Sequence, residues 1–253
     1  MQIASWNVNG IRACAKKGFF DWLSQTSPDI VCLQETRAEP TQLGDQELHP
    51  PGYLSYWQSA EKKGYSGVAL YSKHEPTAVR TLGHPEFDSE GRVLFLEFDS
   101  LVVGSAYFPN SQDGGKRLEY KLKFCDTLKS ELERTVASGK DVILAGDYNI
   151  AHQPIDLARP AENENSAGYL PEERAWMSSF LSSGYIDTFR HFDPSPGRYT
   201  WWSYRGGART RNVGWRIDYH CVNERLRSRL QSVHIQADIH GSDHCPILLN
   251  VKT

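Results

Sequence analysis

The stretch Asp141–Asn149, with the sequence DVILAGDYN, restricts the fold of this 253-residue chain more than any other. Residues 142–145 are apolar and rich in β-branched side chains, so they predict a short buried strand that ends at Gly146. Asp147 and Asn149 follow directly. Because ligands of an α/β sheet bind beyond the carboxyl ends of its strands, these side chains are expected in a functional site. In an extended segment, positions i and i+2 share one face, so one site could use both.

Three other stretches have the same form, an apolar run that leads into amide, acidic or imidazole side chains. Residues 3–6 lead into Asn7 and Asn9, residues 30–33 into Gln34 and Glu35, and residues 233–237, through a turn, into Asp243 and His244. Four strand ends of this kind predict one converging site rather than four separate turns.

The remaining chain alternates between strand-like and helix-like segments. Apolar positions at helical spacing predict helices over 17–25 and over 118–136, the second ending near Gly139. An early proline followed by acids in the first turn predicts a helix over 171–181. Strands are predicted over 53–57, 68–71, 77–82, 92–98, 101–108, 215–222, 230–239 and 246–251. This order indicates one domain over residues 1–253. It predicts a layered α/β fold in which two mixed sheets pack face to face with helices outside.

Composition narrows the function classes. The net charge of −3 argues against a general nucleic-acid coat protein but permits a local basic surface. The five cysteines are odd in number and form no CxxC pair, which disfavours a disulfide framework or a thiolate zinc site. No secretory signal pattern is visible, and no apolar run approaches the roughly 20 residues that span a bilayer. We therefore expect a cytoplasmic protein without a membrane partner.

Four acidic residues belong to or follow the predicted strands: Glu35, Asp147, Asp218 and Asp243. Clustered carboxylates repel one another, so they need a cation or a shared proton. Hard oxygen ligands without thiolates or several histidines favour Mg²⁺, with Mn²⁺ as a substitute, over zinc. A single aspartate after a strand is more often a turn or cap residue than a ligand, but that alternative is weak for the four strand ends together.

Four polar residues near these acids indicate phosphate chemistry. His244 can polarise a phosphoryl oxygen or relay a proton, although a lone histidine is more often a core residue satisfied by a backbone group. Asn7 and Asn149 can hold a carboxylate or a phosphate without adding charge, although asparagine is also common in turns. Tyr107, in the run GSAYFPN, could donate to a phosphate or pack on the following proline.

The segment Tyr199–Arg216, YTWWSYRGGARTRNVGWR, combines aromatic and basic residues and contains no acid. Its basic residues are Arg205, Arg209, Arg211 and Arg216. Basic residues interleaved with aromatics suit a phosphate backbone together with an unstacked nucleotide. The alternative is a solvated basic loop with core tryptophans, and one of Trp201 and Trp202 is expected to face the core in either case.

Seven motifs, spread in order over nearly the whole chain, resemble the exonuclease III family of abasic-site endonucleases. They are WNVNGIRA (6–13), LQET (33–36), GYSGVAL (64–70), AYFPN (106–110), GDYNIAH (146–152), NVGWRIDY (212–219) and GSDHCP (241–246). One such motif would be weak, but seven in this order leave little room for chance. The resemblance implies the four-layered αββα sandwich of the wider endonuclease/exonuclease/phosphatase superfamily.

The resemblance also implies roles for individual residues. Glu35 resembles the main metal ligand and Asn7 orients the metal site, where Asp147, Asn149 and Asp243 also contribute. Asp147 resembles the residue that positions the attacking water. His244, paired with Asp218, resembles the histidine that polarises the phosphate, and Asp243 is a second metal-side or histidine-orienting acid. Tyr107, Asn149 and Asn110 lie on the phosphate side. Trp201, Trp215 and Ile217 match the pocket for an extruded base-free sugar, and Asn163 and Ser166 match a segment that contacts the DNA backbone.

The implied reaction is Mg²⁺-dependent hydrolysis 5′ to an abasic site in double-stranded DNA, leaving a 3′-hydroxyl. Removal of 3′-blocking groups and 3′–5′ exonuclease action are expected from the same site. Some relatives have aspartate where this chain has Asn9, which leaves the number of metals open. Relatives differ at the position of Arg205, which leaves open the balance of endonuclease and exonuclease activity.

Two other functions fit parts of this pattern. A phosphatase acting on phosphoinositides would keep the carboxylates and His244 but would not need the segment Tyr199–Arg216. A non-catalytic binder of damaged DNA would keep that segment but not the metal carboxylates. Because the chain has both, a nuclease is the simpler interpretation.

A monomer is expected, since a duplex must reach the open end of the sandwich. If the protein is prokaryotic, we expect it to be associated with the nucleoid.

Overall fold

The structure is a computed structural model that describes residues 1–252. Its strands are β1 (Gln2–Asn7), β2 (Ile30–Gln34), β3 (Leu54–Gln58), β4 (Val68–Ser72), β5 (Ala78–Thr81), β6 (Val93–Glu97), β7 (Leu101–Tyr107), β8 (Asp141–Asp147), β9 (Tyr185–Asp187), β10 (Asp218–Asn223), β11 (Leu230–Ile235) and β12 (Ile247–Val251). Its α-helices are α1 (Ile11–Ala15), α2 (Phe19–Thr26), α3 (Asp45–Leu48), α4 (Pro85–Asp88), α5 (Leu118–Ala137), α6 (Pro171–Ser182) and α7 (Thr188–Phe192).

The strands form two six-stranded sheets with the same internal pattern. One has the order β11-β12-β1-β2-β4-β3, and the other has the order β5-β6-β7-β8-β10-β9. In each sheet a central parallel pair, β1 with β2 or β7 with β8, is flanked by antiparallel strands on both sides. The sheets are therefore mixed, as predicted. The two sheets share one pattern of strand directions, although the sequence shows no repeat.

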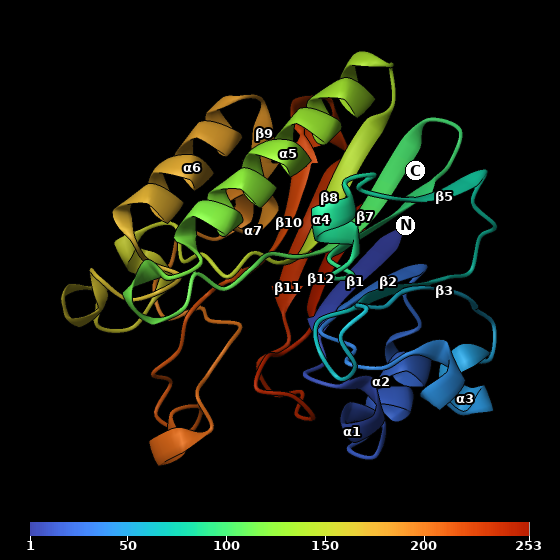
Figure 1. The fold of residues 1–253 in the computed structure, drawn as a ribbon, viewed down its shortest axis with the longest axis horizontal. Coiled ribbons are helices and arrows are strands. Elements are labelled where there is room, and N and C mark those ends of the chain that lie inside the picture. Colours follow the sequence, from blue (N-terminus) through green and yellow to red (C-terminus); the bar gives the residue numbers. More distant parts are fainter. Residues whose placement is uncertain (253) are drawn as a thin grey trace.

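The two sheets pack face to face between two layers of helices (Figure 1). Helices α5 and α6 lie side by side over the outer face of the sheet that contains β8, while α1 and α2 cover the other sheet. The buried positions of α5 include Phe124, Cys125, Leu128 and Leu132, whose spacing is that of one helix face. The central strands are covered on both sides, which explains why they are apolar without alternation. The predicted αββα sandwich is confirmed.

The geometry of the parallel pairs explains the convergence of the polar strand ends. Parallel neighbours end at the same edge, so Asn7 lies beside Gln34 in one sheet and Tyr107 beside Asp147 in the other. The amide of Asn7 donates to Asp147 over 2.8 Å and thereby joins the two sheets at that edge. Loops from both sheets can therefore contribute to one site.

Strand bounds depart from the predictions mainly near this edge. The strand predicted over 215–222 begins at Asp218, because Trp215 instead forms isolated bridges with Leu157 and Trp201. The strand predicted up to residue 239 ends at Ile235. Sequence patterns did not predict β9, α1, α4 or α7, which have five residues or fewer and therefore present little periodicity.

The five cysteines are free and buried, and Cys32 and Cys221 lie in the core as expected. Burial raises the pKa of the Cys32 and Cys221 thiols above the ordinary value, which keeps them protonated. Within residues 1–252, no helix combines the length and the apolar character needed to cross a bilayer.

A buried histidine makes the stability of this fold depend on pH. His220 shares a face of β10 with Val222, which packs between the two sheets, and within residues 1–252 neither of its ring nitrogens has a hydrogen-bond partner. Burial lowers the pKa of His220 from 6.5 to about 3. As pH falls below 6.5 the unfolded chain takes up the proton first. Titration of this group therefore costs the fold nothing at neutral pH and destabilises the fold increasingly as the pH falls from 6.5 to about 3.

We expect His220→Leu to weaken the acid sensitivity of folding. The free energy of unfolding of the wild type should fall relative to that of the variant by up to about 1.4 kcal/mol per pH unit across this range. Urea unfolding followed from about pH 8 down to about pH 4 measures the difference between the two curves. The exposed His234→Leu is the matched control. Parallel curves for the wild type and His220→Leu would contradict the assignment.

Candidate active site

The polar strand ends surround a cavity of about 930 Å³ at the shared edge of the sheets. One part of its lining is polar and includes Glu35, Tyr107, Asn149 and His244. The lining also carries the aromatic residues Trp201 and Trp215, and the ring centroid of Trp201 is 6.5 Å from that of His244. The cavity therefore combines chemistry suited to a charged group with an apolar wall. The predicted site residues along its lining are Glu35, Tyr107, Asn110, Asp147, Asn149, Asn163, Ser166, Trp201, Arg205, Trp215, Ile217, Asp243 and His244.

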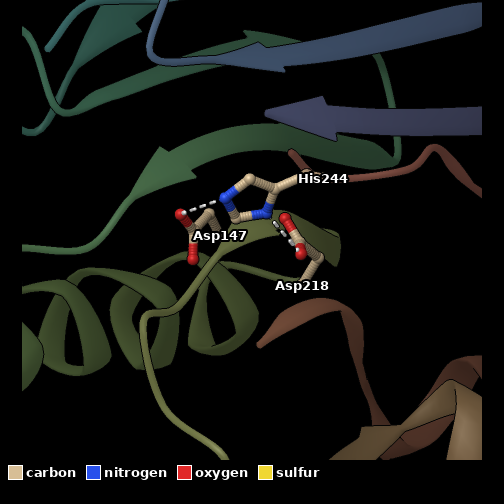
Figure 2. A group of neighbouring side chains, drawn as sticks. All are labelled: Asp147, Asp218 and His244. Atoms are coloured by element: carbon tan, nitrogen blue, oxygen red, sulfur yellow. Dashed lines mark hydrogen bonds and ion pairs between the residues drawn. The ribbon is translucent and has the colours of Figure 1, made fainter. Parts of the chain in front are cut away.

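His244 lies between two buried carboxylates, with one ring nitrogen toward each (Figure 2). Its Nδ1 is 2.9 Å from Oδ2 of Asp218, and its Nε2 is 3.8 Å from Oδ2 of Asp147. Asp218 and Asp147 lie opposite each other on the antiparallel strands β10 and β8, and His244 comes from the turn before β12. The structure thus confirms that the three residues lie together.

The electrostatics of this triad favour a protonated imidazole. Burial alone would lower the pKa of His244, but the charges of Asp218 and Asp147 raise it to about 10. Burial raises the pKa of Asp147, and Asp218 adds to that rise against the attraction of His244. One cation between two carboxylates leaves the triad with a net negative charge when both acids are ionised. The ring can then present an N–H to a negatively charged group in the cavity.

Asp147 is held by amides from both sheets. Its Oδ2 accepts from Nδ2 of Asn7 over 2.8 Å and from Nδ2 of Asn149 over 3.3 Å, while its Oδ1 accepts from the backbone N–H of Asn149 over 2.8 Å. The expected proximity of Asp147 and Asn149 is therefore confirmed, but the reason we gave was wrong. The chain is not extended there, because Asn149 adopts a left-handed conformation with φ of 50°. Asparagine tolerates this conformation better than most residues.

Glu35 lies next to this group and is linked to it by one side chain. Nδ2 of Asn7 donates to Oε2 of Glu35 over 3.0 Å as well as to Asp147. Arg37 pairs with the other oxygen of Glu35, and its side chain is 44% exposed. Oδ1 of Asn7 accepts from the backbone N–H of Asn9, which fixes the orientation of the amide. Its Nδ2 therefore faces the two carboxylates and orients them.

The carboxylate and imidazole atoms at this edge are suitable ligands for a metal ion. Asp147, Asp218 and His244 offer ligand atoms within 4.8 Å of one another, so this group could bind a metal. However, His244 and Asp218 already occupy each other through Nδ1. The oxygens of Glu35 and Asp147 border the cavity and share one neutral donor, which makes them the better pair for a hard cation.

Asp243 is occupied by other side chains. Its Oδ1 accepts from Nδ2 of Asn9 over 2.8 Å, and its Oδ2 accepts from Nε1 of Trp201 over 3.1 Å. Burial opposes ionisation, but the charge of His244 and these hydrogen bonds lower the pKa of Asp243. Asp243 therefore fixes the orientation of Trp201, and the acid that contacts the imidazole is Asp218.

Tyr107 and Asn110 complete the polar side of the cavity. Burial, then the negative charges of Glu35 and Asp147, raise the pKa of Tyr107 above its ordinary value, so its hydroxyl remains available as a donor. Nδ2 of Asn110 donates to Oδ1 of Asn149 over 3.2 Å. This part of the site therefore presents neutral donors beside the carboxylates.

The structure places two arginines of the segment Tyr199–Arg216 away from the cavity, and the predicted DNA contact is wrong for one of them, Arg216. Arg216 is fully buried and pairs with Asp156 and Asp187, both over 2.8 Å, so it cannot meet a phosphate backbone. Arg209 does not line the cavity. Its guanidinium donates to the backbone carbonyls of residues 237, 239 and 242. Trp202 is the tryptophan that faces the core, as expected for one of the pair.

Three arginines that line the cavity were not among the predicted site residues. We call these and Arg205 the rim arginines. Arg37 and Arg159 line the cavity beside Arg205, and so does Arg211, which the sequence indicated only as part of a basic segment. Arg37 could have been found from its position two residues after Glu35. Arg159 lies in a polar loop without a pattern that distinguishes it.

Comparisons with known proteins agree with this geometry. Residues 4–244 match the Endonuclease/Exonuclease/phosphatase family. The chain is 47% identical, over the full length of both proteins, to an exodeoxyribonuclease of Bacillus subtilis. It is 41% identical to a DNA-(apurinic or apyrimidinic site) endonuclease of Dictyostelium discoideum, over 98% of this chain and 69% of that protein. The 3′ phosphatase NExo from Neisseria, solved with a product DNA hairpin, superimposes over the whole of both chains with a TM-score of 0.90 and 26% identity. On these matches and this site, the chain belongs to the Endonuclease/Exonuclease/phosphatase family.

Proposed function

We propose that this chain is a DNA-repair nuclease that hydrolyses the phosphodiester on the 5′ side of an abasic site in double-stranded DNA. The observation that carries this proposal is a buried triad in which Asp147 and His244 line the cavity and Asp218 contacts His244 from outside the lining, with Trp201 and Trp215 in the same lining. The triad suits phosphate hydrolysis, and the aromatic wall suits a sugar without its base.

The residues divide the work of an in-line displacement. Asp147 orients a water molecule and accepts its proton while the water oxygen bonds to phosphorus and the bond to the 3′ oxygen breaks. The 3′ oxygen leaves with the bonding electrons and takes a proton from solvent, which gives the 3′-hydroxyl. The N–H of His244 and the hydroxyl of Tyr107 stabilise the negative charge that develops on the phosphoryl oxygens. Asn149 and Asn110 hold the phosphate in position. A Mg²⁺ ion held by Glu35 and Asp147, with Asp243 nearby, would supply further positive charge against these oxygens.

Substrate selection follows from the cost of extrusion. A nucleotide must leave the stack to enter the cavity, and this costs least where base pairing is already lost. The four rim arginines, Arg37, Arg159, Arg205 and Arg211, offer positive charge to the flanking phosphates despite the acidic net charge of the chain. Asn163 and Ser166, which line the same rim, are placed to contact the backbone. One copy of the chain provides all of these groups, so we expect a monomer to act on duplex DNA in the cytoplasm.

Processing of 3′ ends is a second activity of the same site. The description of the Neisseria relative as a 3′ phosphatase bound to product DNA supports it. A terminal phosphate or blocking group would occupy the position of the scissile phosphate and leave the same 3′-hydroxyl. A 3′–5′ exonuclease reaction needs only that an undamaged terminal nucleotide enters the cavity.

A cleavage assay with three kinds of substrate tests the proposal. Mg²⁺ should support a nick 5′ to a tetrahydrofuran abasic analogue in a labelled duplex, and EDTA should abolish it. An undamaged duplex should be nicked far more slowly. Release of phosphate from phosphoinositide vesicles without cleavage of DNA would favour the lipid phosphatase instead. Binding of the abasic duplex without cleavage at any Mg²⁺ or Mn²⁺ concentration would favour a damage binder.

A further inference from the structure

A buried ion pair lies behind the polar side of the cavity and takes no part in the mechanism above. Nζ of Lys121 on α5 is 2.7 Å from Oε1 of Glu173 on α6, and both side chains are 0% exposed. Helices α5 and α6 lie side by side over the sheet that contains β8 (Figure 1). Removing two charges from water is costly, and a buried pair is therefore weak evidence for stability by itself. What the two groups hold in place indicates their role.

Lys121 holds the backbone of Asn149. Its Nζ donates to the carbonyl oxygen of Asn149 over 2.6 Å, at the residue with the left-handed conformation. The N–H of the same residue donates to Asp147, and its side-chain oxygen accepts from Asn110. With the carbonyl fixed on one side and the N–H on the other, the peptide planes around Asn149 are determined. The position of the Cβ atom follows from them, and the side-chain amide is then fixed by hydrogen bonds with Phe108 and Asn110.

Glu173 holds two other parts of the cavity wall. Its Oε1 accepts from Oγ of Ser111, the neighbour of Asn110, over 2.9 Å. Its Oε2 accepts from the backbone N–H groups of Gly168 and Leu170 over 2.8 and 3.0 Å. These residues end the loop that carries Asn163 and Ser166.

Gly168 in turn touches the segment that Lys121 holds. Its carbonyl accepts from the N–H of Ala151 over 2.8 Å, and a Cβ at Gly168 would lie 3.0 Å from the carbonyl oxygen of Asn149. One carboxylate and one ammonium thus connect three separate segments of the cavity. Neither Lys121 nor Glu173 lines the cavity itself.

We propose that Lys121 and Glu173 are positioning residues that fix Asn149, Asn110 and the 163–168 loop in the arrangement required for catalysis. This inference rests on the proposed nuclease function for its kinetic consequence, but not for its structural one. A displacement of about 1 Å at groups that orient a reacting phosphate can cost about 100-fold in rate. The loss should therefore appear in kcat more than in KM.

Two double variants separate positioning from folding. Lys121→Met alone would leave the buried charge of Glu173 without a partner and could unfold the chain. The apolar double variant, Lys121→Met with Glu173→Gln, carries no buried charge. The amide double variant, Lys121→Gln with Glu173→Gln, differs from it mainly in keeping an N–H donor for the carbonyl of Asn149. A partly exposed pair on the same helix, replaced as Lys129→Met with Glu133→Gln, is the control.

We expect the apolar double variant to lose about 100-fold in kcat on an abasic duplex with little change in KM, while the amide double variant recovers at least about tenfold of that loss. The control with changes at Lys129 and Glu133 should match the wild type. Hydrogen exchange at the N–H of Asn149 should be fastest in the apolar double variant. Equal kcat and equal exchange in the two double variants would overturn the proposal. If the wild type cleaves no abasic duplex, the proposed function fails, and the exchange rates alone decide this inference.

Discussion

Asp147→Asn is expected to lower kcat for cleavage at an abasic site by about 10³-fold, the range associated with loss of a positioned general base. The replacement keeps the shape of the side chain but removes one acceptor. Oδ1 of Asp147 accepts from the N–H of Asn149 and Oδ2 accepts from the amide of Asn7. An asparagine must turn its own N–H₂ toward one of these two donors, whichever way it is placed.

The same variant should not be less stable than the wild type. Because burial raises the pKa of Asp147, the folded state favours the neutral form of this group, and ionisation at neutral pH opposes folding. An uncharged asparagine removes that cost, and we expect this gain to offset the hydrogen bond that its N–H₂ group cannot make. Loss of activity without loss of stability is the expected signature of a functional residue that the fold tolerates rather than requires.

Single-turnover cleavage and thermal unfolding, measured on the same preparations, test both parts of this expectation. Asp141→Asn, at the opposite end of β8, is the matched control, because Asp141 pairs with Arg225 far from the cavity. Cleavage by Asp147→Asn within about tenfold of the wild type would mean that another group positions the water.

Much of the fold could be predicted because its signals are local. The central strands are short and continuously apolar, since they are covered by a sheet on one face and by helices on the other. The 20-residue helix α5 shows its buried face directly in the spacing of its apolar residues. Elements such as β9 carry three residues and are fixed by pairing with β10, which no local pattern reveals.

The site was predictable as a set of residues more than as a geometry. Polar side chains at strand ends indicated Asp147, Asn7 and Glu35, and the structure brings them together. Their arrangement depends on a left-handed residue and on side chains from distant segments. Lys121 lies on an ordinary helix face and gave no signal, since its partner Glu173 is 52 residues away. Arg216 gave a misleading signal, because its charge suggested a contact with DNA. Only the structure shows that it is buried and paired with acidic side chains.

If Asp218 acts on the substrate through His244, as their contact suggests, a second large effect is predictable. His244→Gln should lower kcat by about 10³-fold, because the charged N–H that stabilises the phosphoryl oxygens is lost. Asp218→Asn should lower kcat nearly as far. Without the carboxylate of Asp218, the largest of the charges that offset burial is lost and only those of Asp147 and Asp243 remain, so the pKa of His244 should fall and the ring should lose its proton at working pH.

The double variant distinguishes this coupling from two independent roles. If Asp218 works by holding the proton and orientation of His244 through Nδ1, the variant with both changes should be no slower than His244→Gln alone. Nitrogen NMR of the imidazole gives a reading that does not depend on turnover. His244 should be doubly protonated at neutral pH in the wild type and neutral in Asp218→Asn. Multiplicative losses in the double variant, or an unchanged imidazolium in Asp218→Asn, would show that Asp218 contacts the reaction in another way, for example as a ligand of the metal.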